Sequence, residues 1–146
     1  MSKGITITEE CHVLNLLPPI DTDGTAREGY FSMGNYAHAT IIVASGVIGN
    51  TATVTVFESD DTSGGNEAAI DFKRSADGGA LAWIGNASGF ATGTDDNQFS
   101  VIEIDASQLA SNRPCVGVKI TNAAAHLVTF IVILSGSRYA QAVTSA

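Results

Sequence analysis

The chain has 146 residues, of which 45% are hydrophobic and only 15% are charged. It carries 7 Lys and Arg against 15 Asp and Glu, so its formal net charge is −8. This acidity excludes nucleic-acid binding through phosphates, the apolar content excludes intrinsic disorder, and two cysteines exclude a disulfide-dense secreted scaffold. The length is typical of one domain, and we expect a single domain over 1–146.

Apolar residues recur at every second position along most of the chain, which is typical of strands rather than helices. In chain order, the expected strands are 11–17, 30–33, 37–45, 51–58, 69–74, 80–84, 100–105, 116–121 and 127–134. The best helical fragment, 106–110, has the length of about one turn. Clusters of Gly, Asn, Asp and Pro separate these runs and indicate turns. We therefore predict an all-β fold, a jelly-roll-like antiparallel β-sandwich of about seven to nine strands with at most one short helical turn.

The two ends of the chain lack the apolar stretches of targeting or membrane segments. Residues 1–10 contain no apolar core of a secretory signal, so we expect synthesis in a reducing cytoplasm, with Cys11 and Cys115 as free, buried thiols. The longest apolar run, 127–134, is far shorter than the roughly 20 residues of a membrane-spanning helix, and we expect no membrane contact. We expect 1–10 and 138–146 to be arms, flexible or ordered by a partner.

Two of the expected strands have faces suited to contact with another protein. In 51–58, apolar residues alternate with threonines, and 127–134 is apolar on both faces. A two-layer sandwich covers only one face of a strand, so a chain terminus or another protein must cover the second face. Uncharged surfaces need little desolvation, which favours protein contact. The candidate interface residues have this uncharged character in common: Leu127, Val128, Phe130, Val132, Leu134, Thr51, Thr53 and Thr55.

The histidines and carboxylates do not form a pattern typical of catalysis. His12, His38 and His126 are far apart and form no His-x-His pair, so we expect no metal site on them. Neighbouring carboxylates in the sequence have diverging side chains, whereas general acid–base catalysis needs two groups that face each other across a cleft. We therefore expect no enzyme activity and no cofactor.

Two groups of acidic residues leave calcium binding open as an alternative. Asp60, Asp61 and Glu67 form one group, and Asp95 and Asp96 form the other. Carboxylate oxygens are the ligands that calcium prefers, but the sequence does not indicate whether these side chains meet in space.

Aromatic residues could line a platform for a sugar ring. The candidates are Trp83, Phe90, Phe57, Tyr30 and Tyr36. Because they lie on separate segments, packing within the core or the loops is the main alternative. Exposure of Trp83 and Phe90 would favour carbohydrate binding.

Four segments of the chain, 30–46, 52–58, 99–109 and 114–122, carry a resemblance to a known family. The first reads YFSMGNYAHATIIVASG, and the third reads FSVIEIDASQL. Over residues 28–140 the chain resembles small virion proteins of tailed bacteriophages, the jelly-roll cement or decoration proteins. The motifs concerned are structural, and no contact residues are carried over from the family.

The resemblance implies a structural function without chemistry. Such a protein binds the outer surface of the icosahedral head and cements neighbouring subunits of the major capsid protein. It would be located on the virion after synthesis in the bacterial host cytoplasm. A homodimer or homotrimer is expected, because sites on a capsid lie on or near symmetry axes. The alternatives are another virion component, such as a head-fibre base, neck or tail protein, or a carbohydrate-binding jelly-roll module.

Overall fold

The alternating sequence forms two antiparallel sheets that enclose a common core. The computed structural model describes residues 4, 6–86, 88–121 and 125–137. The elements, in chain order, are α1 (Ile7–Glu10), β1 (His12–Asp21), β2 (Arg27–Ser32), β3 (Tyr36–Ile48), β4 (Thr53–Ser59), β5 (Ala68–Ala69), β6 (Phe72–Ala76), β7 (Ala82–Ile84), β8 (Phe90–Ala91), β9 (Gln98–Asp105), the 3-10 turn η1 (Ala106–Gln108), β10 (Cys115–Ile120) and β11 (His126–Ser137). No helix within these ranges is long and apolar enough to cross a membrane.

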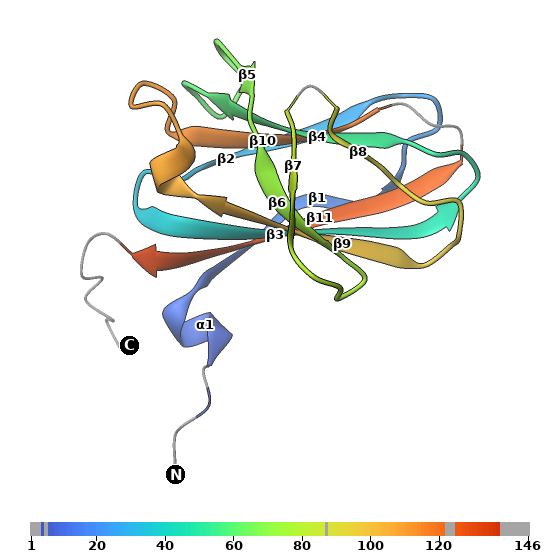
Figure 1. Cartoon of the computed structure of the whole chain (residues 1–146), viewed down its shortest axis with the longest axis horizontal. Coiled ribbons are helices and arrows are strands. Elements are labelled where there is room, and N and C mark those ends of the chain that lie inside the picture. Colours follow the sequence, from blue (N-terminus) through green and yellow to red (C-terminus); the bar gives the residue numbers. More distant parts are fainter. Residues whose placement is uncertain (1–3, 5, 87, 122–124, 138–146) are drawn as a thin grey trace.

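The strand order is that of a jelly roll. The larger sheet has the order β1-β11-β3-β9-β6-β7, and the smaller sheet has the order β2-β10-β4-β5, with β8 also paired to β4. Successive strands from β1 to β4 alternate between the sheets, and β9, β10 and β11 return between them in the same way. In Figure 1, β2, β10 and β4 lie above β1, β11, β3 and β9, and the hairpin of β6 and β7 crosses in front. The predicted antiparallel β-sandwich is confirmed.

The element boundaries differ from the prediction in a few places. Eleven strands occur among the described residues, but β5, β7 and β8 have only two or three residues each. The expected strand 69–74 is divided at Ile70 and Asp71, where the chain passes from the smaller sheet to the larger one. The predicted turn at 106–110 is η1, and a second short turn, α1, precedes β1. Of the two expected arms, 138–146 lies outside the described residues.

The core is formed by the inward faces of both sheets. Val54, Val56, Val118, Ile102 and Ile104 are all at most 1% exposed, so the alternation predicted for β4, β9 and β10 is confirmed. Burial of each such side chain contributes about 1.5–3 kcal/mol relative to exposure. The larger sheet's Phe72 meets Phe90, on the strand β8 paired to the smaller sheet, edge to face at 6.1 Å between ring centroids. This contact joins the two layers beside the hairpin of β6 and β7.

The inward face of β11 corrects the interface prediction. Four of its residues are at most 3% exposed and belong to the core, namely Val128, Phe130, Val132 and Leu134. They fill the space between the sheets, so the expectation that these four contact a partner is wrong for the folded chain. The outward side chains of β11 are instead Leu127, Thr129, Ile131 and Ile133.

The two cysteines are free thiols, as expected. The expected burial is confirmed for Cys115, whereas Cys11 is only half-buried.

Two aspartate substitutions on β11 test which face is the core. Val132→Asp places a carboxylate among apolar side chains and should lower the free energy of unfolding by more than about 4 kcal/mol. Ile131→Asp, one position away on the outer face, should retain the fold, because its carboxylate can remain in water. Thermal unfolding monitored by circular dichroism compares the two. Equal destabilisation by both variants would contradict the assigned faces.

Candidate interaction surface

The outer side of the larger sheet carries apolar side chains from four adjacent strands. In one row across the sheet, Ile131 pairs with Asn15 of β1 and with Ile42 of β3, and Ile42 pairs with Val101 of β9. These residues alternate with core residues in sequence, so they point away from the core. We call the apolar part of this outer surface the apolar face, and its members are Val13, Ile42, Ala44, Phe99, Val101, Leu127, Ile131 and Ile133.

The eight members of the apolar face are uncharged, but Glu103 and Asp105 follow Val101 at the next outward positions of β9, where they pair with His38, so charged groups border this face. Val13, Phe99 and Leu127 are 48%, 42% and 38% exposed, which is high for large hydrophobic side chains. Extended exposed apolar patches on a folded chain mark contact sites for proteins or ligands. No described strand covers this face: β1, β11, β3 and β9 form the lower layer in Figure 1, and α1 lies on this side only at the start of β1.

A groove crosses the apolar face between β1 and β11. It has a volume of about 340 Å³, and Val13, Leu14, Asn15, Pro19, Thr129 and Ile131 line it. The groove lies where β1 shifts register against β11, between Asn15 and Leu17 and again between Leu17 and Ile20. Pro18 and Pro19 have no N–H group, which hinders pairing of a further strand along this part of edge strand β1. The groove is therefore suited to side-chain contacts.

The outer side of the smaller sheet is polar and covered by its own side chains. Tyr30 lies against Gly117, where a Cβ atom would clash with its ring. The Tyr30 hydroxyl donates to Glu67 Oε2 at 2.6 Å, and Lys119 Nζ lies 2.6 Å from Glu67 Oε1. Burial and the hydrogen bond to Glu67 raise the pKa of Tyr30 to about 12. Lys119 also lies over the Phe57 ring, 4.7 Å from its centroid, so little apolar surface stays open here.

The predicted interface residues lie on opposite sides of the sandwich. Thr53 and Thr55 are on the outer side of β4 in the smaller sheet, with the exposed Thr51 just before them. Leu127 belongs to the apolar face of the larger sheet, so one flat partner surface cannot touch both groups. Partner contact by the three threonines and by Leu127 stays a prediction. The outward residues of β1, β3 and β9 were missed, although pairs of apolar residues at successive outward positions, Ile42 with Ala44 and Phe99 with Val101, were the available signal.

The histidines lie in three separate environments. His38 Nδ1 lies 2.7 Å from Asp105 Oδ1, and its Nε2 lies 2.5 Å from Glu103 Oε2. Partial burial opposes the charge of His38, but the hydrogen bonds to the two carboxylates prevail and raise its pKa. His126 is fully buried beside Ser45, and burial lowers its pKa. His12 lies on β1 against the Tyr36 ring. The three rings are thus not brought together.

Most of the carboxylates considered for calcium bind other groups of the protein. Asp61 Oδ1 accepts the backbone N–H groups of Ser63 and Gly65, which lowers the pKa of Asp61. Asp60 Oδ2 accepts a hydrogen bond from Asn66, whereas Glu67 binds Tyr30 and Lys119. Asp96 accepts the backbone N–H of Ile48. No group of three or more His, Cys, Asp or Glu side chains suited to a metal ion occurs in the described ranges.

The five aromatic residues do not form one platform. Phe90 is 6% exposed and packs in the core, so the exposure that would favour carbohydrate binding is not met at this residue. Tyr30 and Phe57 are covered on the smaller sheet, and Tyr36 lies against His12. Only Trp83 among the five is largely exposed, at 61%.

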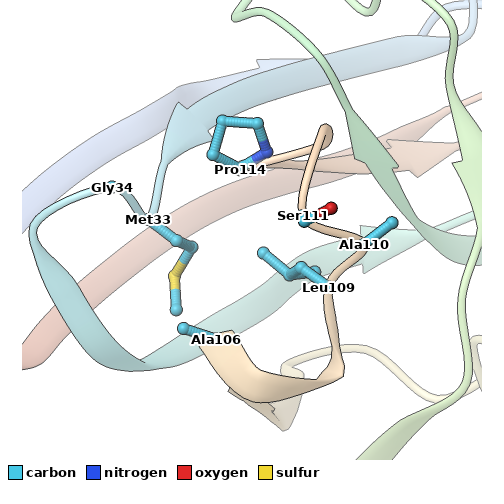
Figure 2. A pocket seen from close by; sticks show the side chains of 7 residues that line it. All are labelled: Met33, Gly34, Ala106, Leu109, Ala110, Ser111 and Pro114. Carbon is cyan, nitrogen blue, oxygen red and sulfur yellow. The ribbon is translucent and has the colours of Figure 1, made fainter.

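A small pocket at one end of the sandwich is structural in character. It has a volume of about 230 Å³ and is lined by Met33, Gly34, Ala106, Leu109, Ala110, Ser111 and Pro114. Figure 2 shows Met33 reaching toward Ala106, with Leu109, Ala110 and Ser111 on the facing loop. The buried Glu58 holds that loop, because it accepts the Ala110 N–H at 2.8 Å and pairs with Arg113 at 3.1 Å. The lining has no acid, base or cation for chemistry.

Comparison with known proteins finds a solved structure with a similar fold. No known protein family matches the sequence, and no curated protein matches it significantly. Among solved structures, the crystal structure of the SPBc2 prophage-derived protein YomS is similar, with a TM-score of 0.55 and 9% sequence identity. The match covers 86% of this chain and 94% of that chain. At this identity, the likeness shows a shared fold.

The pairing of His38 with two carboxylates predicts a pH-dependent contribution to stability. Its folded pKa is raised above the ordinary 6.5, so the contribution is fully present below about pH 6.5 and is lost as pH rises through the folded pKa. His38→Gln should therefore destabilise the fold more at about pH 5.5 than at about pH 9. Urea unfolding of the unaltered chain and of His38→Gln at the two pH values measures this difference. His126 is present in both chains, so its contribution to the pH dependence cancels in the comparison. A larger loss at the higher pH would contradict the assignment.

Proposed function

We propose that this chain is a non-enzymatic structural protein of a bacteriophage virion. In this proposal it binds the outer surface of the icosahedral head and cements neighbouring subunits of the major capsid protein. The observation that carries the proposal is the apolar face, which no described strand covers. The jelly-roll fold, shared with a prophage-derived protein, and the resemblance of four segments to cement proteins support the same function.

The apolar face has the physical properties that a cementing contact needs. Val13, Phe99 and Leu127 already expose apolar surface, and each Å² removed from water contributes about 25 cal/mol before the costs of association. The members of the face are uncharged, so a contact confined to them desolvates no charge, and the bordering Glu103 and Asp105 are already paired with His38. Many copies on one lattice act together, and binding only the assembled lattice stabilises it by mass action. The net charge of −8 favours solubility of the free chain.

The side of the molecule opposite the apolar face, which includes Thr51, Thr53 and Thr55, would then point to solvent, so this proposal assigns partner contact to Leu127 and not to the three threonines. That side carries the network of Tyr30, Glu67 and Lys119, with Glu28 at 3.3 Å from Lys119. These polar groups already satisfy one another, and their desolvation against a coat subunit would be unfavourable. A homodimer or homotrimer would fit capsid sites on symmetry axes. A neck, tail or head-fibre component is the second candidate, because the same face could bind those assemblies.

Attachment to particles tests the contact surface with one substitution on each side of the sandwich. Ile131→Asp should reduce the copies bound per particle at least about tenfold, because it places a charge in the middle of the apolar face. The matched control, Thr55→Asp, adds the same charge near Lys119 on the other side and should bind like the unaltered chain. Quantitative mass spectrometry of sedimented particles, after mixing with each folded variant, gives the copy number. Loss of binding by Thr55→Asp alone would contradict the assignment.

The copy number of the unaltered chain separates a lattice protein from other virion parts. A ratio to the coat protein near one, or a simple fraction such as about one-third, is expected for a cement. A handful of copies per particle would instead support a neck, tail or fibre component. Absence from purified virions would contradict a virion function.

A further inference from the structure

Trp83 has an exposure that the fold does not explain. It is the single tryptophan of the chain and is 61% exposed on the short strand β7, at the edge of the larger sheet opposite β1. A tryptophan usually buries most of its large apolar surface. The Lys73 ammonium lies 5.1 Å from the centroid of the indole ring, but Lys73 does not line the adjacent pocket. The ring therefore has apolar surface available for a ligand.

An open pocket of about 380 Å³ lies beside the Trp83 ring. Its lining combines one aromatic side chain with small apolar and uncharged polar groups and a single carboxylate: Ala69, Ile70, Asp71, Trp83, Asn86 and Gln108. Its volume lies at the lower end of the range of about 300–1,000 Å³ found for small-molecule sites. The residues come from β5, β7, η1 and the connections next to them, so the pocket is built where several segments meet.

Hydrogen bonds hold the polar groups of this pocket in place. Asp71 Oδ1 accepts the backbone N–H of Asn86 at 2.7 Å, and Asn86 Nδ2 donates to the Ala69 carbonyl oxygen at 3.1 Å. Gln108 Nε2 donates to the Asp71 carbonyl oxygen at 3.2 Å. These bonds use one oxygen of the Asp71 carboxylate and one N–H of the Asn86 amide. The other Asp71 oxygen and the Asn86 carbonyl oxygen are available as acceptors for hydroxyl groups.

The charges around Trp83 select the chemical class of the ligand. Asp71 and the net charge of −8 disfavour a phosphate or another anion. The Lys73 ammonium, 5.1 Å from the centroid of the ring, would repel a cationic ligand placed beside the same ring. What fits is a neutral molecule with an apolar face for the indole and hydroxyl groups for Asp71 and Asn86. Pyranose sugars have this combination of C–H faces and equatorial hydroxyls.

We infer that the pocket beside Trp83 binds a neutral hexopyranose, with the ring stacked on the indole and its hydroxyls donating to Asp71 and Asn86. This inference goes beyond the proposed capsid function and does not rest on it. The pocket lies at the β7 edge of the larger sheet, whereas the groove of the apolar face lies at the β1 edge. A sugar could therefore be held while the apolar groove is occupied.

The fluorescence of Trp83 tests this inference directly, because no other tryptophan contributes to the signal. The full chain is titrated separately with glucose, galactose, mannose and N-acetylglucosamine, and with glycerol as a polyol that lacks a pyranose ring. At least one sugar should give a saturable change in emission, with a dissociation constant in about the millimolar range for so small a ligand. Glycerol should give none. Emission that no sugar changes beyond the glycerol effect would overturn the inference.

Three variants check that the sugar occupies this pocket. Asp71→Asn keeps an oxygen for the Asn86 N–H but loses the charge, and should weaken binding about tenfold. Trp83→Ala should abolish sugar contacts in saturation-transfer NMR. Phe99→Ala, on the apolar face, should bind sugar like the unaltered chain and serves as the control. Sugar binding that survives Trp83→Ala would overturn the inference. It would also be overturned if the unaltered chain binds no sugar and Trp83→Ala reduces attachment to particles, because Trp83 would then contact the coat.

Discussion

In a two-layer sandwich each strand can bury only one of its faces, and the rest of the structure depends on this constraint. The core takes Val132 and its inward neighbours on β11, so Ile131 and the alternate residues must face outward. On the smaller sheet, the corresponding outer positions carry Tyr30 and Lys119, which cover that side with a polar network. On the larger sheet a group of adjacent outer positions, including Ile42, Val101 and Ile131, stays apolar, and the two sides of the molecule become chemically different.

The sequence could predict the strands of this fold but not which apolar face each strand would bury. The alternation in 51–58 is unambiguous, because threonines and valines mark the two sides. In 127–134 both sides are apolar. Whether Val132 or Ile131 faces the core depends on the pairing of β11 with β1 and β3. That pairing is fixed by partners about a hundred residues away along the chain, which local periodicity does not report.

The polar clusters could not be predicted for the same reason. Tyr30 and Glu67 are 37 positions apart, and His38 and Glu103 are 65 positions apart, so only the folded topology joins them. The acidic residues left open as calcium ligands have separate partners, because Asp61 binds its own loop while Glu67 binds Lys119 of another strand. Trp83, by contrast, was named from the sequence as a residue whose exposure would favour carbohydrate binding, and it is exposed. Its pocket depends on Gln108, which the turn η1 brings from a distant segment.

The central claim is that the apolar face of the larger sheet binds the coat while the polar side of the smaller sheet faces solvent. A reconstruction of the virion by electron cryo-microscopy, at a resolution that places the strands, tests this claim most directly. The account predicts Ile131 and Phe99 against coat subunits across their seams, with Tyr30 and Lys119 on the outer surface of the particle. The reverse orientation, with Tyr30 and Lys119 buried against the coat and the apolar face in solvent, would contradict it.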